Sequence, residues 1–296
     1  MVSRRAFLFG GAGLGAVAVT GGVGAILVEE DVLPGKVSFD RAIGRCGSLP
    51  ASPRTPGIVQ PQTFRSRRRG TDVTAVVVLP AGVRSLWRLP VVVALHGNGG
   101  SAASAANGLR LDRYLTDVVR TRAVAPFALV TVDGGPDTYW HRRKSGDDPL
   151  GMITEELLPR LGRQGASTDR FGVIGWSMGG YGALLLAETV GAPRMAAAVA
   201  SSPAIFPSYD NARRTNHRAF DDAADFARGD VFAGLGRLTG VPTRVDCGIS
   251  DPFAPMVRRF RKRLRPEGGM SGGCHDGAFW LRHLPDQLAF LGDHLR

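Results

Sequence analysis

The stretch that decides the fold is Asp169–Ala187, which reads DRFGVIGWSMGGYGALLLA. Its first apolar run, Phe171–Ile174, predicts a buried strand, and Ala183–Ala187 predicts a helix. Between them the sequence Gly-Trp-Ser-Met-Gly puts Ser177 on a sharp strand-to-helix turn, the context of a nucleophile elbow. The glycines two residues before and after the serine suit this turn, because a Cβ there would strike the neighbouring strand or helix. The pattern predicts a reactive hydroxyl at Ser177, with the Met178 N–H at a helix N-terminus as an oxyanion donor.

Strands and helices alternate on both sides of this stretch. The predicted strands are 59–65, 72–79, 89–95, 127–132, 195–200 and 241–245, with a short, weakly apolar strand before residue 272. The predicted helices are 109–120, 151–161, 254–264 and 279–295. This alternation indicates an α/β fold with a mostly parallel central sheet, flanked by helices on both faces.

Chemistry in such sheets lies in the loops at the carboxyl ends of the strands. Polar residues gather at those predicted ends: His96, Asp133, Ser177, Ser201, Asp251 and His275. A serine hydroxyl needs a base within hydrogen-bond reach, and the base needs an acid to orient it. The sequence therefore predicts a catalytic site at this edge of the sheet.

The base is predicted from the histidines that follow the serine. His275 stands in a glycine-rich loop between a strand and the last helix, which suits a general base. His217 falls in an irregular stretch, whereas His283 and His294 fall on the terminal helix, where a solvated histidine is the usual interpretation. His275 is the preferred candidate.

The acid is expected between the nucleophile and the base, as chain order in this fold requires. Asp251 follows the strand 241–245 within Gly-Ile-Ser-Asp-Pro-Phe and is the preferred candidate. Asp246 competes with it but falls within or at the end of the strand, and Asp276 is too close to His275 in sequence to orient it. The second oxyanion donor is expected in His-Gly-Asn-Gly-Gly after the strand 89–95, at Asn98 or Gly99, with Asn98 preferred.

Four segments together resemble the esterase family of α/β-hydrolases, which contains S-formylglutathione hydrolases, feruloyl and enterochelin esterases and mycolyltransferases. They are His96–Gly100, Gly175–Gly182, Ser250–Phe253, and His275-Asp276 with the following Phe279–Leu284. The resemblance implies ester hydrolysis or acyl transfer through an acyl-serine, without a cofactor. The leading hypothesis is a serine carboxylesterase acting on a small-molecule or envelope ester. The alternatives are an acyltransferase that uses an envelope sugar or lipid hydroxyl, and a non-catalytic envelope binding module.

Aromatic residues near the predicted site suggest a substrate pocket. Tyr139 and Trp140 are expected to line it, His141 is expected to meet a polar head group, and Trp176 flanks the nucleophile. The competing interpretation of the 137–143 stretch is an ordinary loop with packed aromatic side chains. The longer polar segment 203–240 is predicted to form a cap that selects substrate.

The first 58 residues are predicted to lie outside the catalytic domain, 59–296. Paired arginines and an uncharged Gly/Ala-rich run over 6–28 resemble a twin-arginine export signal, or a retained membrane anchor, within residues 1–30. Either interpretation places the catalytic part outside the cytoplasm. Residues 31–58, rich in Pro and Gly, are expected to form a linker or a strap over the surface.

Composition limits the remaining function classes. The formal net charge is +11, carried by 34 Arg and 3 Lys, but the arginines are scattered and no nucleic-acid motif accompanies them, so nucleic acid is not an expected partner. No spacing suggests a metal site. Of three cysteines, Cys247 and Cys274 are expected at the same end of neighbouring strands, which slightly favours that disulfide; Cys46–Cys274 and Cys46–Cys247 stay open.

Overall fold

The computed structural model describes residues 39–40, 42–122 and 124–295. The predicted export signal or anchor at residues 1–30 therefore lies outside the described residues. Within the part that is described, no helix combines the length and the apolar character needed to span a bilayer.

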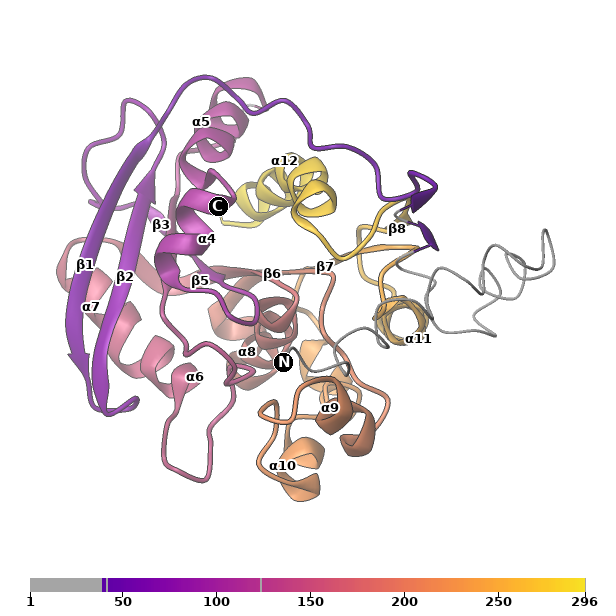
Figure 1. The fold of residues 1–296 in the computed structure, drawn as a ribbon. Coiled ribbons are helices and arrows are strands. Elements are labelled where there is room, and N and C mark those ends of the chain that lie inside the picture. Colours follow the sequence, from indigo (N-terminus) through magenta and orange to yellow (C-terminus); the bar gives the residue numbers. More distant parts are fainter. Residues whose placement is uncertain (1–38, 41, 123, 296) are drawn as a thin grey trace, which may run out of the picture.

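Eight strands form a continuous sheet in the order β1-β2-β4-β3-β5-β6-β7-β8 (Figure 1). β1 and β2 pair antiparallel, as do β2 and β4, and all other neighbours are parallel. The sheet is thus mostly parallel, as predicted. The strands are β1 (Ile58–Ser66), β2 (Thr71–Leu79), β3 (Pro90–Leu95), β4 (Ala128–Val132), β5 (Ser167–Trp176), β6 (Met195–Ser201), β7 (Thr243–Gly248) and β8 (Met270–Ser271).

Successive side chains of a strand point to opposite faces of the sheet. Each face therefore carries its own apolar side chains, and helices cover both faces. Val91 and Val93 of β3 belong to one buried cluster, whereas Val92 and Ala94 belong to another. The first cluster packs under α6 (Pro149–Met152), the π turn η1 (Ile153–Leu157), α7 (Leu158–Arg163), α8 (Met178–Arg194) and α11 (Ala254–Leu264); the second packs under α4 (Ala102–Gly108), α5 (Leu111–Thr121) and α12 (Gly277–His294). Helices packed on both faces of one central sheet confirm the predicted α/β-hydrolase architecture.

The predicted segment 203–240 forms three short elements: α9 (Tyr209–Thr215), α10 (Ala223–Arg228) and the 3-10 turn η2 (Leu235–Leu238). Figure 1 shows α9 and α10 together on the opposite side of the molecule from α5 and α12. The sequence does not predict helix α4, because its residues AASAANG show no amphipathic periodicity. It is fixed by its N-cap Ser101, whose hydroxyl accepts a hydrogen bond from the Ser104 N–H.

The structure corrects the favoured cysteine pairing. Cys46 and Cys274 form the disulfide, with their Cα atoms 4.8 Å apart, and Cys247 is free. Cys247 lies within β7 rather than in a loop, and its side chain is fully buried in the core on the α8 and α11 face. Burial raises the pKa of the Cys247 thiol.

Candidate active site

Ser177 occupies a strained turn between β5 and α8. Its backbone angles are φ 57° and ψ −118°, a conformation that non-glycine residues rarely adopt. The glycines on either side are sterically required: a Cβ on Gly175 would overlap the Gly179 carbonyl, and one on Gly179 would overlap the Leu95 carbonyl. The Ser177 N–H donates to the Ser201 carbonyl, 3.0 Å away, so the turn is also fixed to β6.

Three side chains from distant segments converge above this turn. The Nε2 atom of His275 lies 2.8 Å from the Ser177 hydroxyl oxygen, and its Nδ1 lies 2.8 Å from an Asp251 carboxylate oxygen. Asp251 follows β7 and its side chain is fully buried, while His275 lies between β8 and α12. The Phe253 N–H donates to the other carboxylate oxygen, at 2.8 Å, and fixes the orientation of Asp251.

The competing aspartates have other partners. Asp246 is buried in β7, paired with Arg244 at 2.8 Å and bonded to the Gln287 amide at 2.9 Å. Asp276 caps α12 by accepting the Phe279 N–H.

The competing histidines also lie away from Ser177. His283 is 2.9 Å from the Ser271 hydroxyl, and His294 is bonded to the Phe290 carbonyl within α12. His217 borders a separate surface pocket together with Asp137 and Arg218.

Asn98 lies on the loop after β3, and it lines the same cavity as Ser177. The main-chain N–H groups of Asn98 and Met178 have no acceptor within the described part of the chain. The loop is held by His96, whose Nε2 accepts the Gly134 N–H at 3.1 Å and whose Nδ1 contacts the Gly97 carbonyl at 2.9 Å. This pattern requires a neutral imidazole, and burial lowers the pKa of His96 in agreement with it.

A cavity of about 540 Å³ opens next to Ser177 and His275. Trp176 lines it, as predicted, and Trp280 at the start of α12 lines it too, with its ring 5.5 Å from that of His275. The remainder of the lining consists of His96, Asn98, Leu109 and small residues, and no Lys, Arg, Asp or Glu is among its described residues. The sequence analysis does not predict that Trp280 lines this cavity, although Trp280 lies five residues after the predicted base and within the Phe279–Leu284 segment of the family resemblance.

The structure does not bring Tyr139, Trp140 or His141 to this cavity. Tyr139 and Trp140 both adopt positive φ angles, 51° and 61°, and this double turn directs the rings inward. Trp140 is fully buried and its indole N–H donates to the His96 carbonyl at 3.2 Å, while Tyr139 packs on Tyr181, Phe206 and Phe220. The structure therefore corrects the expectation that Tyr139 and Trp140 line the substrate pocket, because both side chains are packed in the interior.

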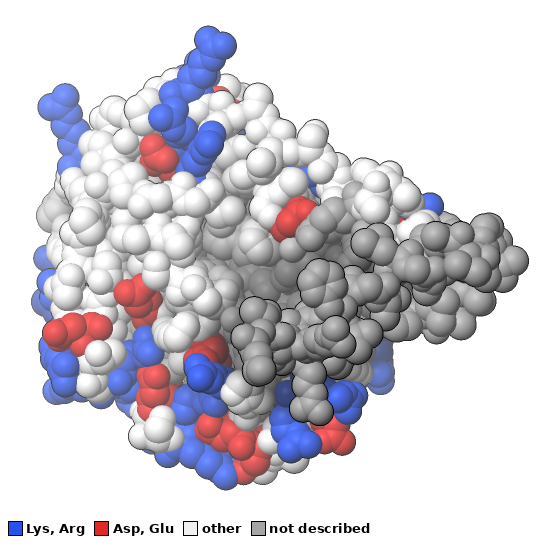
Figure 2. Space-filling model, in the orientation of Figure 1, with Lys and Arg blue, Asp and Glu red and all other residues white. Residues whose placement is uncertain are grey.

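His141 lies at a second cavity, of about 570 Å³, between the 141–155 segment and α10. Its ring stacks on Phe220, and its Nε2 contacts the Ala219 carbonyl at 3.0 Å. None of the residues of α9, α10 or η2 lines the cavity at Ser177, so the role of 203–240 as a substrate cap stays a prediction. Figure 2 shows basic and acidic side chains interleaved along the lower edge of this face, over the region of α9 and α10.

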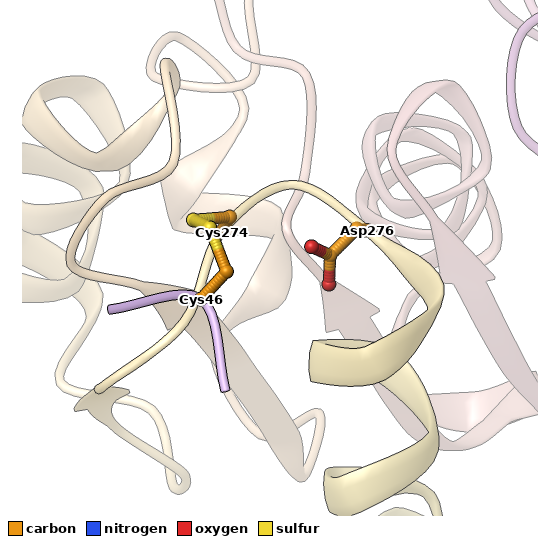
Figure 3. Close-up of side chains that lie close together, drawn as sticks. All are labelled: Cys46, Cys274 and Asp276. Atoms are coloured by element: carbon orange, nitrogen blue, oxygen red, sulfur yellow. A yellow bond between two sulfur atoms is a disulfide. The ribbon is translucent and has the colours of Figure 1, made fainter. Parts of the chain in front are cut away.

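One group of potential metal ligands occurs in the described part of the chain: Cys46, Cys274 and Asp276, whose ligand atoms lie within 4.8 Å of one another (Figure 3). The two sulfur atoms are bonded to each other, so neither is available as a thiolate ligand. In this state the group is a disulfide beside an N-cap aspartate.

Comparison with known proteins agrees with this geometry. The Esterase family model matches residues 66–283. The S-formylglutathione hydrolase of Paracoccus denitrificans (strain Pd 1222) is 28% identical over 269 residues, covering 81% of this chain and 92% of the relative. Among solved structures, a ferulic acid esterase superposes with a TM-score of 0.71 at 18% identity, covering 82% of this chain and 100% of the other. An S-formylglutathione hydrolase from Agrobacterium tumefaciens gives 0.67 at 18% identity, covering 84% and 100%.

The fold and the matches define an α/β-hydrolase. The chain belongs to the Esterase family, whose model spans the sheet from the end of β1 into α12. It is an enzyme that acts on carboxylic esters.

Proposed function

We propose that this enzyme is a serine carboxylesterase that hydrolyses uncharged esters outside the cytoplasm, through an acyl intermediate on Ser177. The observation that carries the proposal is the continuous chain of contacts from the Ser177 hydroxyl to His275 Nε2, at 2.8 Å, and from His275 Nδ1 to the buried Asp251, at 2.8 Å. Such a chain gives a serine hydroxyl the base that it lacks in water.

In the proposed mechanism, His275 accepts the Ser177 proton as the serine oxygen attacks the ester carbonyl. The negative charge on the carbonyl oxygen is received by the Met178 and Asn98 N–H groups, which have no other acceptor in the described residues. His275 then gives the proton to the departing alcohol, leaving an acyl-Ser177 ester. Water, deprotonated by the same imidazole, releases the acid and restores the serine.

The preference for an uncharged substrate follows from the cavity. Its lining combines Trp176, Trp280 and Leu109 with small and polar residues, and the imidazoles of His96 and His275 are the only ionisable side chains that it has among the described residues. A glutathione thioester carries two carboxylates, and the described lining offers no Lys or Arg to pair with them. We therefore expect neutral esters to be better substrates than the S-formylglutathione named for the Paracoccus relative.

The extracytoplasmic location rests on two independent features. The sequence begins with paired arginines and an uncharged run, and the described residues contain the Cys46–Cys274 disulfide, a bond that persists mainly in oxidising compartments. Cell fractionation with an antibody tests this part, and recovery of the mature chain only from the cytosol would contradict it.

The catalytic part is tested by hydrolysis of p-nitrophenyl butyrate and by labelling with a fluorophosphonate probe. We expect both in the wild type, neither in Ser177→Ala, and slower hydrolysis of S-formylglutathione than of the neutral ester. Unchanged turnover by Ser177→Ala would overturn the mechanism.

A further inference from the structure

The residue before His275 is Cys274, which is fully buried and bonded to Cys46 (Figure 3). Cys46 belongs to residues 42–57, called here the strap segment. This segment runs from beside β8 across α12 to the start of β1 (Figure 1). The disulfide therefore joins two parts of the chain that are 228 residues apart, directly next to the proposed general base.

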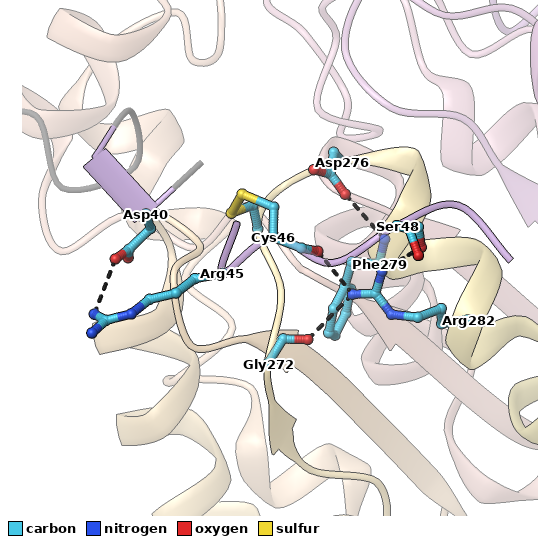
Figure 4. Close-up of a disulfide and its surroundings, with 9 residues drawn as sticks. Asp40, Arg45, Cys46, Ser48, Gly272, Asp276, Phe279 and Arg282 are labelled. Atoms are coloured by element: carbon cyan, nitrogen blue, oxygen red, sulfur yellow. Dashed lines mark hydrogen bonds and ion pairs between the residues drawn. A yellow bond between two sulfur atoms is a disulfide. The ribbon is translucent and has the colours of Figure 1, made fainter. Parts of the chain in front are cut away.

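A second connection joins the same two parts. The Arg282 guanidinium, from α12, donates to the Ser48 carbonyl at 3.0 Å and the Cys46 carbonyl at 3.1 Å, both in the strap segment (Figure 4). It also donates to the Gly272 carbonyl at 3.2 Å, in the loop that leads to His275. Lysine could not reproduce this arrangement, because a guanidinium presents several donors in a fixed plane.

The sheet itself gives this loop little support. β8 has only two residues, and it pairs with β7 through Cys247–Met270 and Gly248–Ser271 alone. Beyond β8, the loop main chain accepts the Ser250 N–H at Gly273, at 3.0 Å. The Ser271 hydroxyl also lies 2.9 Å from His283 Nε2, so contacts outside the sheet carry much of the work of keeping the His275 imidazole aligned with both of its partners.

We propose, building on the proposed function, that the Cys46–Cys274 disulfide and Arg282 are positioning elements for His275, and that the oxidation state of this cysteine pair controls turnover. In the oxidised protein the strap segment holds the 272–276 loop in the catalytic arrangement. A dithiol reductant transfers two electrons and two protons to the sulfur atoms, giving two thiols and a cyclic disulfide of the reductant. The loop then keeps its non-covalent contacts, among them those with Arg282, Ser250 and His283, but loses its covalent link to the strap segment.

The test compares turnover of p-nitrophenyl butyrate by the full chain in oxidised and dithiothreitol-reduced forms, with thiols counted by mass spectrometry after alkylation. Because ångström-scale misplacement of a catalytic group costs up to about a hundredfold in rate, we expect kcat to fall roughly tenfold or more on reduction and to recover on reoxidation. KM should change less than twofold, since the displaced group is His275 and the apolar lining residues Trp176 and Leu109 lie on other segments.

Variants separate the two connections from general loosening of the strap segment. Cys46→Ser should reproduce the reduced kcat and lose the response to dithiothreitol. Arg282→Gln should lower kcat, with Arg282→Lys no better. The matched control is Arg113→Gln, which removes the 2.6 Å bond to the Arg54 carbonyl at the other end of the strap segment and should keep kcat. All are assayed well below their melting temperatures.

The outcomes distinguish this proposal from the function on which it rests. Equal kcat in the oxidised protein, the reduced protein and Cys46→Ser, with hydrolysis still abolished by Ser177→Ala, would overturn the positioning role and leave the esterase mechanism intact. An oxidised protein that is neither labelled by fluorophosphonate nor dependent on Ser177 would refute the esterase mechanism and this proposal together. A loss of kcat in Arg113→Gln equal to that in Cys46→Ser would refute the specific role of the disulfide.

Discussion

The Trp140 indole donates a hydrogen bond to the His96 carbonyl, 3.2 Å away, and the two rings lie 5.0 Å apart. This pair holds the start of the loop that carries Asn98. Because Trp140 is fully buried, the bond is protected from water, and we interpret it as the support of the oxyanion loop.

The first prediction concerns this bond. Trp140→Phe keeps an aromatic ring but removes the donor, so we expect about 1 kcal/mol less stability and a kcat roughly tenfold lower as the Asn98 N–H moves out of line. Urea unfolding and steady-state kinetics measure the two effects. The control is Trp87→Phe, because Trp87 is 69% exposed and lies beside Gly165, ahead of the start of β5. Full kcat in Trp140→Phe would contradict the supporting role.

The second prediction uses the strain at Ser177. Its φ of 57° and ψ of −118° are easily adopted by glycine but not by a residue with a Cβ. Ser177→Gly should therefore raise the stability by about 1 kcal/mol while abolishing turnover, whereas Ser177→Ala should abolish turnover without that gain. Differential scanning calorimetry of the three proteins is the measurement. A Ser177→Gly variant less stable than Ser177→Ala would show that the turn stores no strain.

The third prediction concerns Glu188, a buried carboxyl on α8 whose Oε1 has no partner in the described residues and whose Oε2 is 3.4 Å from Arg237. Burial raises its pKa to about 8. Between the unfolded value near 4.5 and pH 8, the folded protein keeps a proton that the unfolded chain has released, so stability falls as pH rises through this window.

Glu188→Gln removes this titration and should flatten the decline. We expect the wild type to lose on the order of 2 kcal/mol between pH 5 and pH 9 relative to the variant, measured by urea unfolding at each pH. Asp169→Asn, at an exposed position on β5, is a control for charge removal. Parallel curves for wild type and Glu188→Gln would exclude Glu188 as the source.

The juxtaposition of Ser177, His275 and Asp251 could be predicted from sequence because local constraints determine it. Gly175 and Gly179 identify the elbow by steric need, and parallel strands bring the loops after β5, β7 and β8 to one edge. Chain order then selects Asp251 and His275. None of these steps requires knowledge of how side chains pack.

Other features depend on packing between segments that have no sequence period. Whether Tyr139 and Trp140 face a cavity or the core is decided by two consecutive positive φ angles, which neither residue type favours. The disulfide partner of Cys274 depends on the path of the irregular strap segment, which brings Cys46 beside it. Trp280 reaches the cavity only because α12 begins next to His275.

The fourth prediction concerns this tryptophan. Trp280 lines the cavity from α12, so Trp280→Ala should enlarge it and shift the preferred substrate toward longer acyl chains. We expect the ratio of kcat/KM for p-nitrophenyl octanoate to that for the acetate to rise roughly tenfold, which is about the free energy of burying two extra methylene groups. A ratio is used because the ring also contacts His275, and loss of that contact lowers kcat for every ester alike. Trp280→Phe retains most of the ring and serves as the matched variant, with a small change expected. An unchanged ratio in Trp280→Ala would mean that the acyl chain leaves Ser177 in another direction, away from Leu109 and the start of α12.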